Sequence, residues 1–225
     1  MADYYSKHLS GSRLQEVYEI ASPRIRQYLD AELRHVTDLV KGRDKVLDLG
    51  CGYGRVLKEM APHVGRMVGC DVSRSTLAYA RSFLQAVENY DLVRMTADRT
   101  GFRENSFDGV VCVQNGISAF GVNPTSLVAE AVRVSREGGL IVFSGYSPRI
   151  WEVRLEWFRA QSRAGLVGQI DERLSRGGTI VCKDGFRSTT VTGPDFSTLF
   201  RKAGQRARIL EIDESSIFAE VVKGS

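Results

Sequence analysis

The sequence of 225 residues lacks any apolar run close to the roughly 20 residues that a membrane-spanning helix needs. Its opening stretch, MADYYSKHLSGSRLQ, also lacks the apolar core of a signal peptide. Together these two absences predict a cytoplasmic protein with no membrane partner.

Cysteine is scarce, and Cys51, Cys70, Cys112 and Cys182 show no C-x-x-C spacing. Three of them lie in or beside apolar, strand-like runs, which predicts buried free thiols and no metal site. The formal charge of +4 is spread along the chain, and no block of Lys and Arg reaches five or six residues. This charge pattern permits nucleic-acid binding but does not indicate it.

Repeats and low-complexity segments are also absent, so the length and the hydrophobic content of 43% predict one large core. Strands alternate with helical patterns from about residue 45 to 145, which predicts parallel strands joined by crossover helices. The candidate strands, short and rich in Val, Ile and Leu, are residues 45–49, 66–70, 92–96, 109–113 and 140–144. The expected fold is a doubly wound α/β sheet.

Helix ends and turns complete this reading of the chain. Ser73 is expected to cap one helix, and Asn123 caps another that begins at Pro124 and ends at Gly138 and Gly139.

After Pro148 the regular alternation of strands and helices ends. A helix over about 150–164 is followed by two runs of alternating apolar and polar residues, which Gly177 and Gly178 separate like a hairpin turn. A helix ending at Gly204 and two final strands follow, which would add an antiparallel strand to the sheet.

The loop in VLDLGCGYGR, residues 46–55, has glycine at every second position. The dinucleotide fingerprint G-x-G-x-x-G can begin at Gly50 and Gly52, but Arg55 then stands where its third glycine belongs. This mismatch argues against a nicotinamide dinucleotide. The loop instead suits a ligand whose amino-acid part and ribose pass over the glycines.

Three carboxylates follow or end successive strands near this loop. Asp71 can accept hydrogen bonds from both hydroxyls of a ribose, and Asp98 can accept one from an exocyclic amine such as that of adenine. Asp48 can orient loop amides or reach a ligand ammonium group. Three acidic groups at one edge of the sheet favour a cationic ligand.

The stretches VLDLGCGYG, GCDVS, TADRTGFRENSFDGVV and REGGLIVFS together resemble the class I S-adenosylmethionine-dependent methyltransferases, over roughly residues 40–145. The resemblance implies a Rossmann-like sheet of seven strands, mostly parallel with an antiparallel last strand. It also implies S-adenosylmethionine as cofactor and S-adenosylhomocysteine as product. The cofactor-binding residues that it implies are Asp48, Gly50, Cys51, Gly52, Gly54, Arg55, Asp71, Val72, Ala97, Asp98, Arg99, Gln114 and Asn115.

Further expectations concern the methyl acceptor. QNGI stands where methyltransferases of exocyclic amines carry N/D-P-P-Y/F, and small-molecule enzymes of this group commonly have lids like residues 1–40 and 148–192. We therefore expect one domain over 1–225 with a cofactor-binding core at 41–147, closing elements at 193–225 and a small-molecule acceptor.

Tyr5, His8 and Asn115 are the candidate catalytic residues, and Trp157 and Phe158 fit a core stripe better than a substrate cage. An RNA methyltransferase and a non-catalytic cofactor-binding regulator remain as alternatives. The sequence leaves open whether the acceptor atom is O, N, S or C, and whether the protein is a monomer or a homodimer.

Overall fold

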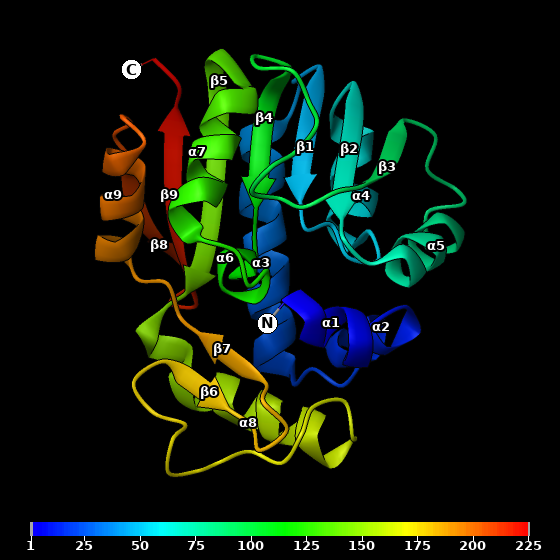
Figure 1. Ribbon diagram of the computed structural model, residues 1–225, viewed down its shortest axis with the longest axis vertical. Helices are drawn as coiled ribbons and strands as arrows, with labels where there is room; N and C mark the ends of the chain where they lie inside the picture. Colours follow the sequence, from blue (N-terminus) through cyan, green and yellow to red (C-terminus); the bar gives the residue numbers. More distant parts are fainter. Residues whose placement is uncertain (1, 225) are drawn as a thin grey trace.

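The computed structural model describes residues 2–224, and its centre is a seven-stranded sheet in the order β3-β2-β1-β4-β5-β9-β8 (Figure 1). The strands are β1 (Lys45–Leu49), β2 (Arg66–Asp71), β3 (Tyr90–Arg94), β4 (Phe107–Cys112), β5 (Ser135–Tyr146), β8 (Arg208–Ile212) and β9 (Ser216–Val222). Strands β1 to β5 pair in parallel, and β9 runs antiparallel to both β5 and β8. The predicted fold, including the reversed last strand, is confirmed.

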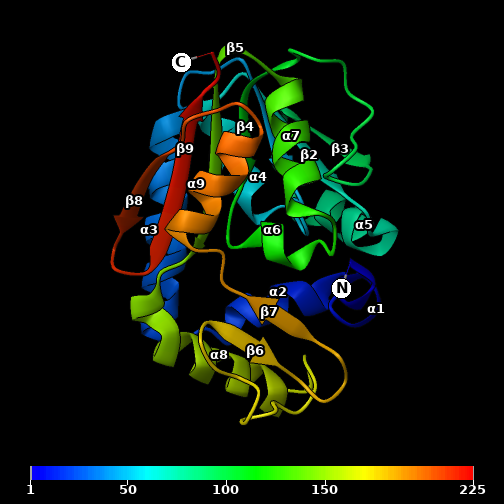
Figure 2. The same cartoon turned by 60° about the vertical axis from the view of Figure 1, so that its left-hand side comes forward.

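Helices cover both faces of the sheet because side chains alternate between the faces along each strand. Helices α3 (Pro23–Val40), α4 (Arg55–Met60) and α5 (Arg74–Phe83) pack on one face. Helices α6 (Gly116–Ala119), α7 (Pro124–Val134) and α9 (Gly193–Lys202) lie on the opposite side, where α7 and α9 stand in front in Figure 2. The Ser73 and Asn123 caps form as predicted, since each side chain accepts a hydrogen bond from a backbone N–H of the first helical turn.

A third layer lies beyond the ends of the parallel strands, and it has a hydrophobic cluster of its own. It contains α1 (Ala2–His8), α2 (Ser12–Glu19), α8 (Trp151–Arg163), and the hairpin of β6 (Thr179–Val181) and β7 (Arg187–Thr189) (Figures 1 and 2). The C-terminal half of α3 covers the sheet, whereas Ile25, Tyr28 and Leu29 in its N-terminal half belong to the hydrophobic cluster of the third layer. The part of the proposed N-terminal lid that reaches this layer is therefore α1, α2 and the beginning of α3.

Several boundaries differ from the prediction, since β4 begins at Phe107 instead of residue 109 and β5 extends over Ser135–Tyr146 instead of 140–144. Helix α7 ends at Val134 rather than at Gly138, because Ser135 already pairs with Phe107 and β5 begins there. Strand β3 begins and ends two residues earlier than predicted.

The turn predicted at Gly177 and Gly178 forms, with positive φ at both glycines and an antiparallel bridge between Arg176 and Thr179 across it. The run before this turn makes only isolated bridges, and the paired strands are β6 and β7, which a second turn at residues 182–186 joins. Asp171 Oδ1 accepts hydrogen bonds from the N–H groups of Arg173 and Leu174, and this local turn replaces the expected strand.

All four cysteines are buried free thiols, as predicted, and burial raises the pKa of the Cys70 thiol to about 12. Within residues 2–224, no helix has both the length and the apolar character that crossing a membrane would require.

Candidate active site

A cavity of about 190 Å³ lies between the ends of the parallel strands and the third layer. One side, which we call the strand-end wall, contains Gly50, Gly52, Cys70, Asp71, Val72, Ser73, Met95, Thr96, Ala97, Gln114 and Phe120. The other side, the helical wall, contains Tyr5, Leu9, Leu14, Val17, Tyr18, Tyr146, Trp157, Phe158 and Gln161. The cavity therefore joins the glycine loop to the N-terminal segment and to residues 146–161.

The glycine loop requires residues without a side chain at two places. Gly50 has φ +79° and Gly52 has φ +54°. A Cβ at Gly50 would lie 2.2 Å from the Phe120 ring, and one at Gly52 would lie 2.9 Å from Leu14. The N–H groups of Gly50 and Cys51 both donate to the Cys70 carbonyl at 2.9 Å, which fixes the loop to β2. Close approach to this backbone is possible because both loop positions are glycine.

Asp71 stands where β2 ends and lines the cavity. Its carboxylate accepts hydrogen bonds from the N–H groups of Gly52 at 3.1 Å and Ser73 at 2.8 Å. Burial raises the pKa of this carboxyl, and the two amides partly oppose that effect. The side chain is thus held at the cavity by backbone donors on both sides.

Asp48 lies buried at the end of β1, and its Oδ2 atom has no hydrogen-bond partner. Burial raises the pKa of this carboxyl to about 7, while the positive charge of Arg55 acts in the opposite direction and Asp71 adds to the rise. A buried carboxylate oxygen without a donor is costly, so this position suits a cationic ligand nearby.

These features fit S-adenosylmethionine. The glycine backbone, the Asp71 carboxylate, the unpartnered Asp48 oxygen and the apolar side chains of Val72 and Ala97 lie at one edge of the sheet, as the donors and walls for such a ligand should.

The structure places the predicted site residues in two groups. Those that line the cavity are Tyr5, Gly50, Gly52, Asp71, Val72, Ala97 and Gln114. Those that do not line it are His8, Asp48, Cys51, Gly54, Arg55, Asp98, Arg99 and Asn115. Asn115 instead uses its amide to bind the backbone of Thr189 and Val191, and His8 is exposed and stacks on Tyr4. The ligand roles of both groups stay predictions.

Sequence reasoning missed Glu32, a fully buried residue of α3 behind the strand-end wall. Its Oε1 atom accepts hydrogen bonds from the Gln114 N–H at 3.0 Å and the Ser144 hydroxyl at 2.6 Å. The Gln114 side chain in turn accepts from the Tyr18 hydroxyl at 2.6 Å and from Arg55 at 3.1 Å. The available signal was an acidic residue within the apolar stripe of an amphipathic helix.

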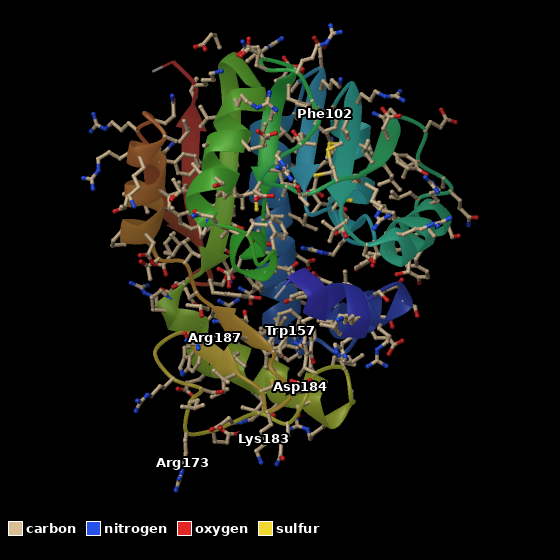
Figure 3. The ribbon with its side chains drawn as sticks, in the orientation of Figure 1. Phe102, Trp157, Arg173, Lys183, Asp184 and Arg187 are labelled. Carbon is tan, nitrogen blue, oxygen red and sulfur yellow. The ribbon has the colours of Figure 1, made fainter. Side chains whose placement is uncertain are left out.

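The helical wall is aromatic and carries one polar group without a partner. Trp157 donates its indole N–H to the Val17 carbonyl at 3.0 Å, and Figure 3 shows it between the N-terminal helices and the hairpin. Trp157 and Phe158 belong to the hydrophobic cluster, as predicted, and they also face the cavity. Gln161 is 1% exposed, and its Nε2 atom has no hydrogen-bond partner.

Comparisons with known proteins agree with this geometry. Residues 46–139 match the family model described as methyltransferase domain. The chain is 28% identical over 115 residues to the uncharacterized methyltransferase YcgJ of Bacillus subtilis, covering 48% of this chain and 43% of that protein. It is 32% identical over 102 residues to the ubiquinone biosynthesis O-methyltransferase of Hahella chejuensis, covering 44% and 42%. The chain thus spans less than half the length of these curated relatives.

A solved structure matches nearly the whole chain. The magnesium protoporphyrin IX methyltransferase ChlM from Synechocystis PCC 6803, with bound S-adenosylhomocysteine, superposes with a TM-score of 0.67 at 15% identity. The match covers 99% of this chain and 98% of that one. This likeness extends over the third layer as well as the sheet.

Proposed function

We propose that the chain is a class I S-adenosylmethionine-dependent methyltransferase that methylates a small-molecule acceptor, a proposal supported by its fold and by the methyltransferase domain matched at residues 46–139. One observation carries the proposal. The glycine loop and Asp71 share a single cavity with an aromatic wall built from α1, α2 and α8. Cofactor and acceptor can therefore meet in one enclosed space.

The strand-end wall would hold the cofactor, which supplies a methyl group activated by a sulfonium sulfur. Gly50 and Gly52 would admit its amino-acid part, Asp71 would accept the ribose hydroxyls, and Val72 and Ala97 would flank the adenine. The carboxylates at this wall favour the positive charge of such a ligand.

The helical wall would orient the acceptor and exclude water. Methyl transfer needs alignment of the attacking atom and removal of solvent, and good alignment alone can lower a barrier by about 7–11 kcal/mol. Large apolar side chains on three helices suit this task. Two relatives are named for acting in ubiquinone biosynthesis or on magnesium protoporphyrin IX, both small molecules, and this supports the same acceptor class here.

The first test is calorimetric titration with S-adenosylhomocysteine, beside NAD, followed by transfer of a labelled methyl group to a panel of small acceptors. We expect binding of S-adenosylhomocysteine alone. Labelling of RNA but not of any small acceptor would contradict the proposal, and binding without any transfer would favour a regulator.

A matched pair of variants tests whether the helical wall binds the acceptor without affecting cofactor binding. Gln161→Leu removes a buried, unpartnered amide and should keep the fold, whereas Gln169→Leu changes an exposed residue that accepts a hydrogen bond only from Lys183. We expect Gln161→Leu to raise the acceptor KM about tenfold and to leave S-adenosylhomocysteine affinity unchanged. Gln169→Leu should change neither value.

A further inference from the structure

We propose that the helical wall selects a planar acceptor whose methylated oxygen is acidic, such as a phenol or an enol, and rejects acceptors that carry an ammonium group. This inference rests on the proposed function and names its acceptor class. The argument comes from two arginines that lie behind the aromatic side chains.

The shape of the wall favours a flat ring. Tyr5, Tyr18, Tyr146, Trp157 and Phe158 face the cavity from four different elements. Aromatic surfaces of this kind pack well against a planar ligand. Taken alone, they would serve a cation equally well, because aromatic rings attract cations to their faces.

The guanidinium groups of Arg55 and Arg154 argue against binding of a cationic acceptor at these rings. The guanidinium of Arg55 lies over the Tyr18 ring at 5.0 Å from its centroid. The guanidinium of Arg154 lies 4.1 Å from the Tyr146 centroid and 5.6 Å from that of Phe158. Three of the five rings already hold a cation, so a ligand ammonium would meet like charges there.

The two arginines differ in how their charge is compensated. Arg55 has the Glu32 carboxylate at 3.9 Å. Arg154 is 1% exposed, and it donates to the Gly178 and Ser188 carbonyls and to the Thr190 and Ser188 hydroxyls. Among the side chains that the structure describes, those of residues 4, 5 and 7–224, no carboxylate pairs with it. A buried charge without a counter-ion favours an anion in the adjacent cavity.

The field of Arg154 reaches the cavity surface. Its charge acts to lower the pKa of Tyr146 and of Tyr5, against the larger effect of burial, which raises both. Glu32, buried behind the strand-end wall, acts on the pKa of Tyr146 in the opposite direction, but its carboxylate is engaged by Ser144, Gln114 and Arg55. Asp71 belongs to the opposite wall, where the cationic cofactor would bind, and Asp48 is buried at the end of β1.

An acceptor that binds as an oxyanion needs no strong base in the protein for methyl transfer. The hydroxyl proton passes to solvent water as the acceptor binds, and Arg154 stabilises the resulting oxyanion. The oxygen lone pair then forms the new O–C bond, while the S–C bond breaks and its electron pair stays on sulfur. Neutral S-adenosylhomocysteine and a methyl ether result.

The decisive experiment uses three ligands of matched shape on the full chain saturated with S-adenosylhomocysteine. They are 4-nitrophenol, the neutral 4-nitroanisole and the ammonium-bearing 4-nitrobenzylamine, each titrated by calorimetry. We expect 4-nitrophenol to bind at least about tenfold more tightly than the ether, and the amine not to bind. Absorbance should show the pKa of bound 4-nitrophenol about one unit below its value in water.

Variants then assign the preference to Arg154. Arg154→Met keeps an apolar stem without charge, Arg154→Lys keeps the charge, and Arg163→Met is a control at an exposed position of the same helix. We expect the ratio of phenol to ether affinity to fall about tenfold in Arg154→Met alone. A merely structural role would weaken both ligands equally and leave the pKa of the bound phenol unchanged.

The wild-type ligand panel decides the proposal even if a variant fails to fold. Equal or tighter binding of the ether or the amine would overturn it, as would failure of 4-nitrophenol to bind a protein that binds S-adenosylhomocysteine. A wild-type protein that does not bind S-adenosylhomocysteine would instead contradict the proposed function.

Discussion

The two walls of the cavity present different chemistry to a ligand. The strand-end wall offers glycine backbone, short side chains and the Asp71 carboxylate, all placed by neighbouring strands of one sheet. The helical wall offers large aromatic rings from helices α1, α2 and α8 and from the end of β5, with Arg55 and Arg154 behind them.

The two sides of the cavity therefore carry charges of opposite sign. Unpaired or partly exposed carboxylates lie at the strand-end wall, whereas a buried guanidinium without a carboxylate partner lies behind the helical wall. A cationic methyl donor and an electron-rich acceptor would each meet the opposite charge. Each prediction below alters one side of this comparison and leaves the other intact.

The largest effect is expected at the glycine loop. In Gly50→Val the new side chain would displace the Phe120 ring, which lines the cavity and lies 2.2 Å from the required Cβ position. We expect calorimetry to show S-adenosylhomocysteine affinity reduced more than about 100-fold. Gly138→Val is the control, since Gly138 has φ +71° but no atom within 4 Å of a Cβ. It should cost about 1–2 kcal/mol of stability and leave binding unchanged.

The second prediction concerns the pH dependence of stability. The pKa of Asp48 in the folded state is about 7, above the ordinary value of 3.8, so the folded protein binds more protons than the unfolded chain between these limits. The stabilising contribution of Asp48 is therefore complete below about pH 4 and is lost as pH rises through 7. In urea unfolding at pH 8 without ligand, Asp48→Asn should be more stable than the wild type by an amount of the order of 4 kcal/mol.

The control for this prediction is Asp91→Asn on β3, which β2 separates from β1 in the sheet. Arg66 holds the pKa of the Asp91 carboxyl below its usual range, so its stabilising contribution is lost on acidification instead. Its removal should not raise stability at pH 8. A wild-type protein as stable as Asp48→Asn at both pH 5 and pH 8 would show that Asp48 is not desolvated.

The strand-end wall could be predicted from sequence because its features are local. A strand, its glycine loop and Asp71 lie within 27 residues, so the pattern of residue types already fixes their backbone neighbourhood. The doubly wound sheet followed from the same alternation of strands and helices, and the number of seven strands followed from the family resemblance. At Ser135 strand pairing overrode the local helix signal, whereas around Asp171 a local turn formed where a strand was expected.

The helical wall could not be predicted because tertiary packing alone assembles it. Tyr18 and Trp157 are 139 positions apart in sequence, and their ring centroids lie 6.3 Å apart in the fold. A stripe of aromatic residues on one helix has the same spacing whether it packs in a core or faces a cavity. The role of Arg154 likewise depends on the neutral residues that surround it in the fold, and no sequence motif predicts which residues those are.

The third prediction tests how the strand-end wall holds its ligand. Asp71→Asn removes a charged acceptor while the amide keeps most of its shape. Hydrogen bonds to charged groups contribute about 1.5–3 kcal/mol, so we expect S-adenosylhomocysteine to bind about 10- to 100-fold more weakly by calorimetry. Asp91→Asn again serves as control and should leave affinity unchanged. An unaltered affinity in Asp71→Asn would mean that the ribose hydroxyls find their acceptor elsewhere.

The smallest effect is expected at a hydrogen bond that joins two segments of the third layer. The Tyr4 hydroxyl donates to Asp184 at 2.5 Å, which connects α1 to the turn between β6 and β7. Tyr4→Phe removes a bond of about 0.5–1.5 kcal/mol, so amide hydrogen exchange of α1 should accelerate about tenfold while the sheet amides stay protected. Tyr90→Phe, a change on β3, should leave α1 unaffected. If exchange accelerates equally in the sheet, the two walls unfold as one unit, and the helical wall cannot open independently to admit an acceptor.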